Sequence, residues 1–204
     1  MDKYCEYQIL YNAGVDVKER VIYLVGDIDL GTVDTMVQAL GYFNSEKHCP
    51  DSFQEPIQIY INSLGGSDDL MMFGYDAIIR SSCEVQTIGS GVVCSAATLL
   101  LVAGDKRACT ENCLFMVHKG TTTITGNEDE IQAGAEIHKK VSTQYWRLLE
   151  RHTNLTAAKW LSLSKRKGEV WIDAAAMKQY DVVDEVLTSP RRNFKPLSTR
   201  RMTI

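Results

Sequence analysis

The chain lacks the long apolar runs and the excess of positive charge that mark two large classes of proteins. No apolar stretch is long enough to cross a bilayer, so we expect no transmembrane segment. The 22 Lys and Arg residues are outnumbered by 26 Asp and Glu, and the resulting net charge of -4 offers no basic surface for nucleic acid. The first twenty residues contain acidic side chains and no apolar signal core, so we expect a cytoplasmic protein without a targeting leader.

Nucleotide-binding and metal-binding motifs are also missing. The sequence has no glycine–lysine loop of the Walker type, so any dependence on ATP would come from a partner. Its six cysteines include one close pair, Cys109 and Cys113, but no second pair that would complete a four-ligand zinc site. We therefore expect no metal and no cofactor, and we expect the thiols to be reduced and mostly buried.

Short apolar strands alternate with amphipathic helices along the chain, which predicts an α/β fold with parallel strands. Strands are predicted near residues 21–25, 57–61, 85–88, 114–117 and 182–187, and helices near residues 32–44, 68–82, 95–103, 128–152 and 173–179. Because 45% of the 204 residues are hydrophobic, we expect one core and one domain over residues 1–188. Residues 189–204 are basic and contain proline, which predicts a mobile tail.

A serine and a histidine lie at positions that suit acyl transfer. Ser95 follows a predicted glycine turn at residues 89–91 and begins an apolar helix, and His118 ends an apolar strand. By composition alone, a serine at a helix start is more often an N-cap than a nucleophile. The nucleophile interpretation gains support because His118 offers a general base and the helix start offers N–H groups for an oxyanion.

A second glycine turn offers another oxyanion donor. Gly65 and Gly66 follow an apolar strand and precede the helix predicted near residues 68–82. One N–H group of this turn, together with the N–H of Ala96, would hold a developing oxyanion. Taken alone, a double glycine is equally compatible with a plain strand-to-helix connection.

Motifs along residues 17–188 resemble, in order, those of the ClpP family, the proteolytic subunits of Clp proteases. That family consists of serine peptidases in the crotonase-like superfamily. The matching segments are residues 19–26, 60–66, 75–79, 91–104, 115–118 and 179–184. The resemblance implies an α/β fold, a crotonase/ClpP-like spiral of ββα units with a protruding helix–strand handle at about residues 119–152.

The resemblance also assigns site residues one by one. Ser95 falls on the family's nucleophile, His118 on its general base and Glu169 on its acid. Gly66 and Ala96 fall on the two oxyanion N–H donors. An extended substrate is expected to bind beside Gly65 and, by strand addition, along Thr121, Thr122, Thr123, Ile124 and Thr125.

The chain departs from the family pattern at several of these positions. Glu169 replaces an aspartate, Leu64 replaces a proline, and the two residues after the nucleophile are Ala–Ala instead of Met–Gly. A carboxylate of either length can orient an imidazole, and an oxyanion donor comes from the backbone, so we expect the chemistry to survive. Two residues compete for roles, Cys94 as nucleophile and Asp173 as acid. Helix register predicts that Cys94 is a small buried residue, and the three alanines after Asp173 predict an N-cap.

The resemblance implies a serine endopeptidase that cleaves unfolded polypeptides inside an oligomeric chamber. The family forms heptameric rings that pair into a tetradecamer, and an AAA+ unfoldase ATPase delivers the substrate. Basic residues 165–167 lie where the family joins its two rings, so the pairing of rings in this chain stays open. Three alternatives also stay open: a catalytically inactive ring subunit, a crotonase-type enzyme acting on thioesters, and a virus-encoded protease or decoy on the same fold.

Overall fold

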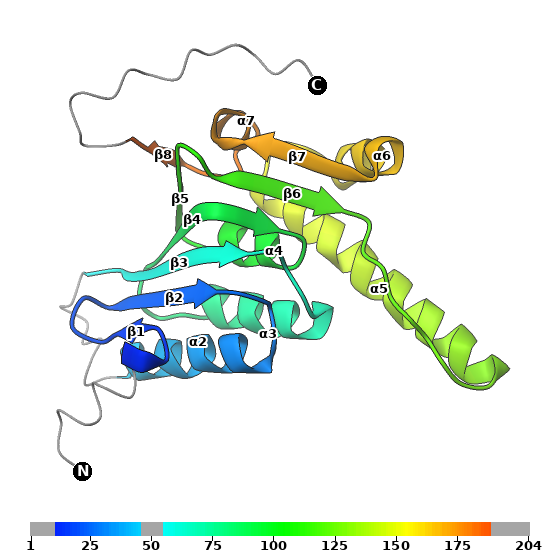
Figure 1. Ribbon diagram of the computed structural model, residues 1–204, viewed down its shortest axis with the longest axis horizontal. Helices are drawn as coiled ribbons and strands as arrows, with labels where there is room; N and C mark the ends of the chain where they lie inside the picture. The colour runs from blue at the N-terminus through cyan, green and yellow to red at the C-terminus, as the bar shows by residue number, and fades with distance from the viewer. Residues whose placement is uncertain (1–10, 46–54, 189–204) are drawn as a thin grey trace.

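The computed structural model describes residues 11–45 and 55–188, and Figure 1 shows how their helices and strands are arranged. The predicted tail at residues 189–204 lies outside the described residues. No helix in the described part of the chain is long and apolar enough to cross a membrane.

Within the described residues, eight strands form one mixed sheet, which agrees with the predicted α/β class. The strands are β1 (Val15–Asp16), β2 (Val21–Val25), β3 (Ile57–Ser63), β4 (Val85–Cys94), β5 (Lys106–Thr110), β6 (Leu114–His118), β7 (Glu169–Asp173) and β8 (Glu185–Leu187). Strands β2, β3 and β4 are parallel neighbours, and β4 pairs with both β5 and β6. Strand β7 pairs antiparallel with β6, which places the start of β7 opposite the end of β6.

Six helices accompany this sheet in the described residues: α2 (Leu30–Phe43), α3 (Asp68–Ile79), α4 (Ala97–Val102), α5 (Glu128–His152), α6 (Ala157–Lys167) and α7 (Ala174–Gln179). Helix α3 packs against both α2 and α4, helices α2 and α4 contact the sheet, and every residue of α4 is buried. The C-terminal part of α5 is buried through Tyr145, Trp146 and Leu149, whereas its N-terminal part extends away from the body. This projecting helix corresponds to the helix of the predicted handle (Figure 1), but residues 119–127 form no strand, so the predicted strand of the handle is wrong.

Strand β4 is longer than predicted, and this difference positions the nucleophile segment. The predicted tight turn at residues 89–91 is wrong, because these residues lie inside β4. The strand pairs with β5 up to Gly89 and with β6 from Val92 onward. Gly91 has a φ of 75°, a conformation that glycine adopts readily, and it lets the strand bend and change partners. Because of this bend, the end of β4 lies beside β6.

The cysteines follow the prediction in part. Cys94, Cys109 and Cys113 are free, buried thiols, as expected. Cys83 is disulfide-bonded, so the expectation of reduced thiols is wrong at this position.

Candidate active site

Ser95 lies in a sharp turn between β4 and α4. Its φ of 53° is unusual for a residue other than glycine, and its N–H donates to the Met116 carbonyl of β6 at 2.8 Å. Helix α4 begins at Ala97, and Ala96 occupies its N-cap without a side-chain hydrogen bond. The N-cap interpretation of Ser95 is therefore wrong, and its hydroxyl is available for another partner.

That partner is His118, the last residue of β6. Ser95 Oγ lies 2.8 Å from His118 Nε2, within hydrogen-bond distance. The two side chains come from adjacent parallel strands, because β6 pairs with the end of β4. With the ring proton on Nδ1, Nε2 can accept the hydroxyl proton of Ser95. The arrangement is that of a serine nucleophile with its general base.

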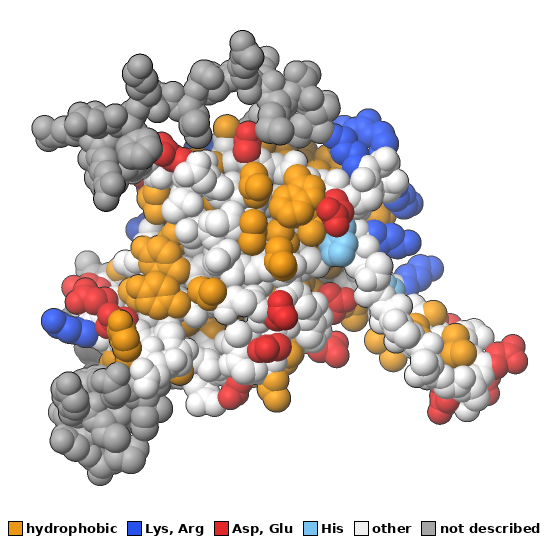
Figure 2. All heavy atoms as spheres, viewed as in Figure 1, with side chains coloured by type: hydrophobic (Ala, Val, Ile, Leu, Met, Phe, Trp, Pro, Cys, Tyr) orange, Lys and Arg blue, Asp and Glu red, His pale blue; other side chains and the backbone are white. Residues whose placement is uncertain are grey.

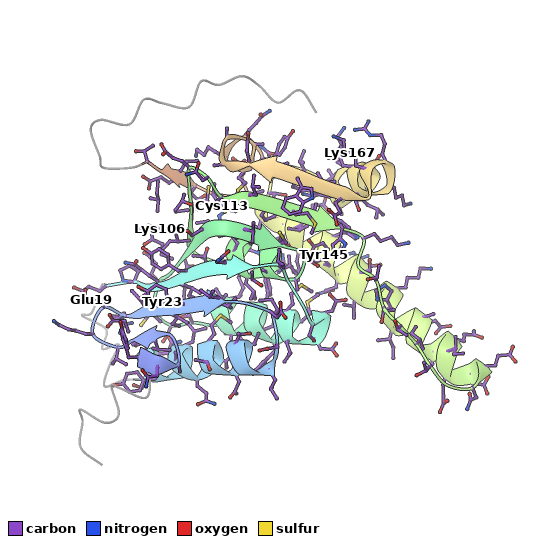
Figure 3. The ribbon with its side chains drawn as sticks, in the orientation of Figure 1. Glu19, Tyr23, Lys106, Cys113, Tyr145 and Lys167 are labelled. Atoms are coloured by element: carbon purple, nitrogen blue, oxygen red, sulfur yellow. The ribbon has the colours of Figure 1, made fainter. Side chains whose placement is uncertain are left out.

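A second hydrogen-bonded group fixes the backbone of Ser95. The Thr98 hydroxyl donates to the Ser95 carbonyl, and Thr98 Oγ1 lies 2.8 Å from Tyr145 Oη. The Thr98 hydroxyl donates its only proton to Ser95, so the Tyr145 hydroxyl is the donor to Thr98, and burial keeps that hydroxyl protonated by raising the Tyr145 pKa. Figure 3 shows Tyr145 at the base of α5, where the helix meets the body. Sequence reasoning missed both residues, because nothing in the local pattern links positions 47 residues apart.

Replacing Thr98 by valine tests this support. The change keeps the side-chain shape but removes the bond to the Ser95 carbonyl, so we expect kcat to fall about three- to tenfold, the cost of one hydrogen bond. Steady-state kinetics on a fluorogenic peptide would measure it. The matched control is Thr143→Val, because the Thr143 hydroxyl bonds Lys139 on an exposed part of α5. Equal rates for the two variants would contradict the assigned support.

The glycine turn after β3 lies directly against the nucleophile. A Cβ atom built at Gly65 would stand 2.7 Å from Ser95 Cβ and 3.1 Å from the Ala96 nitrogen. Gly66 has a φ of 154°, and its neighbours Gly65 and Ser67 make the backbone bonds to Ile28. Among the described residues, neither the Gly66 N–H nor the Ala96 N–H has a hydrogen-bond acceptor. Two free N–H groups beside a serine are what an oxyanion requires.

Glu169 is adjacent to His118, but its carboxylate is hydrogen-bonded to Trp171 and makes no hydrogen bond to His118. The two residues are direct cross-strand partners at the end of the β6–β7 pair. Glu169 Oε2 accepts a 2.8 Å hydrogen bond from Trp171 Nε1, and in the described residues no carboxylate pairs with the His118 ring. Asp173 accepts a 2.8 Å bond from the Ala176 N–H and caps α7, which confirms its predicted N-cap role.

Cys94 is confirmed as a buried residue. Its side chain is fully inaccessible, and burial, aided by the charge of Glu169, raises the pKa of its thiol to about 11. A protonated thiol without solvent access is a poor nucleophile. Ser95 is therefore the nucleophile candidate at this turn.

A groove of about 630 Å³ opens beside Ser95 and His118. Its walls are residues 64 and 66–69 at the turn after β3 and the start of α3, residues 120–122 and 124, and helix α5. Of the predicted substrate-binding residues, Thr121, Thr122 and Ile124 line the groove. Gly65, Thr123 and Thr125 are not among the residues that line it. The groove joins the nucleophile to α5, because Ser95, Ile137 and Val141 all line it.

Comparison with known proteins agrees with this geometry. Residues 7–190 match the family model described as Clp protease. The ATP-dependent Clp protease proteolytic subunit of Bacteroides fragilis is 32% identical over 171 residues, covering 83% of this chain and 79% of that protein. Subunit 1 of Rhodopirellula baltica is 28% identical, covering 84% and 73%, and subunit 2 of Corynebacterium efficiens is 28% identical, covering 84% of each.

The family match spans nearly all of the described fold, from the first strands through the last. It includes the turn at Ser95, the strand end at His118 and the handle helix. The sequence-based identification of the family is confirmed, and the chain belongs to the Clp protease family as a ClpP-like protease subunit.

Proposed function

We propose that this protein is a serine endopeptidase whose nucleophile is Ser95 and whose general base is His118. The observation that carries the proposal is the 2.8 Å bond between these two side chains at the edge of a groove. The same geometry disfavours a thioester-specific crotonase activity, because such chemistry has no need of an activated serine.

Catalysis follows from the positions of these groups. A substrate peptide lies along residues 120–124 as an added strand, with its scissile carbonyl at Ser95. His118 takes the hydroxyl proton as Ser95 attacks, and the N–H groups of Gly66 and Ala96 stabilise the oxyanion. His118 then protonates the leaving amine, and water hydrolyses the acyl-enzyme by the same route.

Glu169 is the proposed acid of the triad. Directly opposed residues in an antiparallel pair project from the same face with Cβ atoms about 5 Å apart, so the Glu169 side chain can reach the His118 ring. Trp171 lies two residues further along the same face and holds the carboxylate through its indole N–H. Release from Trp171 would let Glu169 accept a hydrogen bond from the Nδ1–H group of His118 and so fix the imidazole tautomer.

Replacing Trp171 by phenylalanine tests this competition. The change removes the indole N–H and keeps an aromatic ring, so we expect kcat/KM to rise about two- to fivefold, the value of one hydrogen bond. The gain should vanish when Trp171→Phe is made in a Glu169→Gln background. The same gain in both backgrounds, measured as initial rates of peptide hydrolysis, would show that Trp171 does not act through Glu169.

We further propose that the protein works in the cytoplasm as a heptameric ring, with two rings stacked through the handle, and receives unfolded chains from an AAA+ ATPase. Exposed apolar side chains on sheet strands support assembly: Tyr23, Val25, Leu114 and Trp171. Figure 2 shows hydrophobic side chains gathered over these strands, a feature typical of subunit contacts. Native mass spectrometry should find multiples of seven subunits, and a stable monomer would exclude the ring.

Labelling with an alkyl fluorophosphonate tests the catalytic proposal directly. Intact mass should show one adduct per chain on the wild-type protein and none on Ser95→Ala. Cys94→Ala should still be labelled, because the buried thiol takes no part. Absence of an adduct on the folded, assembled protein, with and without a candidate unfoldase, would instead identify a catalytically inactive ring subunit.

A further inference from the structure

One carboxylate beside the nucleophile has no role in the mechanism above. Asp68, the first residue of α3, lines the groove and an adjoining recess of about 20 Å³. Ser95 and His118 line the same two cavities. The carboxylate therefore lies next to the position of a substrate side chain that adjoins the scissile bond.

Helix stability does not account for the placement of Asp68. Acidic side chains in the first helical turn interact favourably with the helix dipole, and exposed Asp69 fits this role. The side chain of Ser67 already caps α3 through the Leu70 N–H. Asp68 instead is partly buried near His138 and His118, and in the described residues its carboxylate accepts no hydrogen bond. Burial raises its pKa, and the neighbouring histidines partly offset this effect.

The surroundings of Asp68 supply no permanent cation. The titratable side chains that line the recess are Asp68, His118, His138 and Tyr145. Among the described residues, no lysine or arginine lines the recess or the groove. A partly buried carboxylate without a hydrogen-bonded partner is unfavourable, and a cationic ligand would relieve this cost.

We propose that Asp68 makes the enzyme prefer lysine or arginine on the acyl side of the scissile bond. The inference rests on the serine peptidase function proposed above and adds its substrate class. The aliphatic stem of such a side chain would lie along the groove wall formed by Ile137 and Val141 of α5, and its charged end would reach Asp68. The recess has room for about one water molecule, so a large apolar side chain would cover the carboxylate without pairing with it.

Two peptidyl diphenyl phosphonates that differ only in lysine or leucine at the reactive position test the preference. Their second-order rates of Ser95 modification are measured by intact mass on the full chain, with an alkyl fluorophosphonate as a reference that carries no such side chain. We expect the lysine probe to react about 10- to 100-fold faster with the wild type, the range for one charged hydrogen bond. Asp68→Asn should lower this ratio at least about tenfold, and Asp68→Glu should keep a preference for lysine.

Asp76→Asn is the matched control, because it removes the same charge from α3 but from an exposed side chain that lines neither the recess nor the groove. Its lysine-to-leucine ratio should stay within about twofold of wild type if the effect is local to Asp68. Modification of Asp68→Asn by the fluorophosphonate confirms that the variant is folded and reactive. A wild-type preference for leucine, or an unchanged ratio in Asp68→Asn, would overturn the specificity and leave the peptidase intact. If no probe modifies Ser95, both the peptidase function and this specificity are wrong.

Discussion

Alanine at Ser95 or at His118 is expected to lower kcat for peptide hydrolysis by a factor of about 10⁶, the loss seen when a serine nucleophile or its base is removed. Ser95→Ala removes the attacking oxygen, and His118→Ala leaves a hydroxyl that no base can deprotonate near neutral pH. Both side chains lie at strand ends and are only partly buried, so the fold should survive each change. Hydrolysis of a fluorogenic peptide, with native mass spectrometry as the assembly check, would measure the effect.

The double variant distinguishes a catalytic unit from two independent contributions. Because Ser95 and His118 act in one proton transfer, removal of both should cost no more than removal of either. Ser90→Ala is the control for the serine-to-alanine change. Ser90 lies on β4, the strand that precedes Ser95, and does not line the groove, so this variant should keep nearly full activity. Additive losses in the double variant would mean that the hydrogen bond at 2.8 Å is not used in catalysis.

The sequence predicted the helices better than the strand ends. Helix α5 occupies the predicted residues 128–152, because its capping residue Asn127 and its long amphipathic pattern are local signals. Strands β1, β5 and β7 and helix α6 were not predicted. Strand β5 is short and partly polar, and β7 alternates exposed with buried residues over only five positions, so neither stands out in a window of sequence.

The candidate site shows the same division between local and tertiary signals. Ser95 and His118 could be proposed from sequence because Ser95 precedes an apolar helix and His118 ends an apolar strand, and the structure places them in contact. Thr98 and Tyr145 could not, because their contact depends on how α5 packs against α4. The position of the Glu169 carboxylate could not be predicted either, because it depends on whether the Glu169 side chain turns toward Trp171 or toward His118.

Alanine at Gly65 is expected to lower kcat/KM at least about 100-fold, because it displaces the backbone of the nucleophile turn. A loss of this size is typical when an oxyanion donor is removed or a reacting group is misplaced by about 1 Å. The new methyl group would stand 2.7 Å from Ser95 Cβ and 2.8 Å from the Cys94 carbonyl oxygen. Carbon atoms at this distance overlap, so the nucleophile turn must move away. Movement shifts the Ser95 hydroxyl from His118 and the Ala96 N–H from the oxyanion position, because Ser95 and Ala96 both lie in the turn between β4 and α4.

Gly26→Ala separates this displacement from the cost of the backbone conformation. Gly26 has a φ of 105°, against 104° at Gly65, so alanine is strained by a similar amount at both positions. A Cβ atom at Gly26 would meet nothing within 4 Å. Gly26→Ala should therefore lose about 1–2 kcal/mol of unfolding free energy in urea and Gly65→Ala more, because of the added overlap, but only Gly65→Ala should lose activity. Comparable activity in the two variants would mean that the glycine turn does not constrain the nucleophile, and the oxyanion donors would then have to be sought away from Gly66.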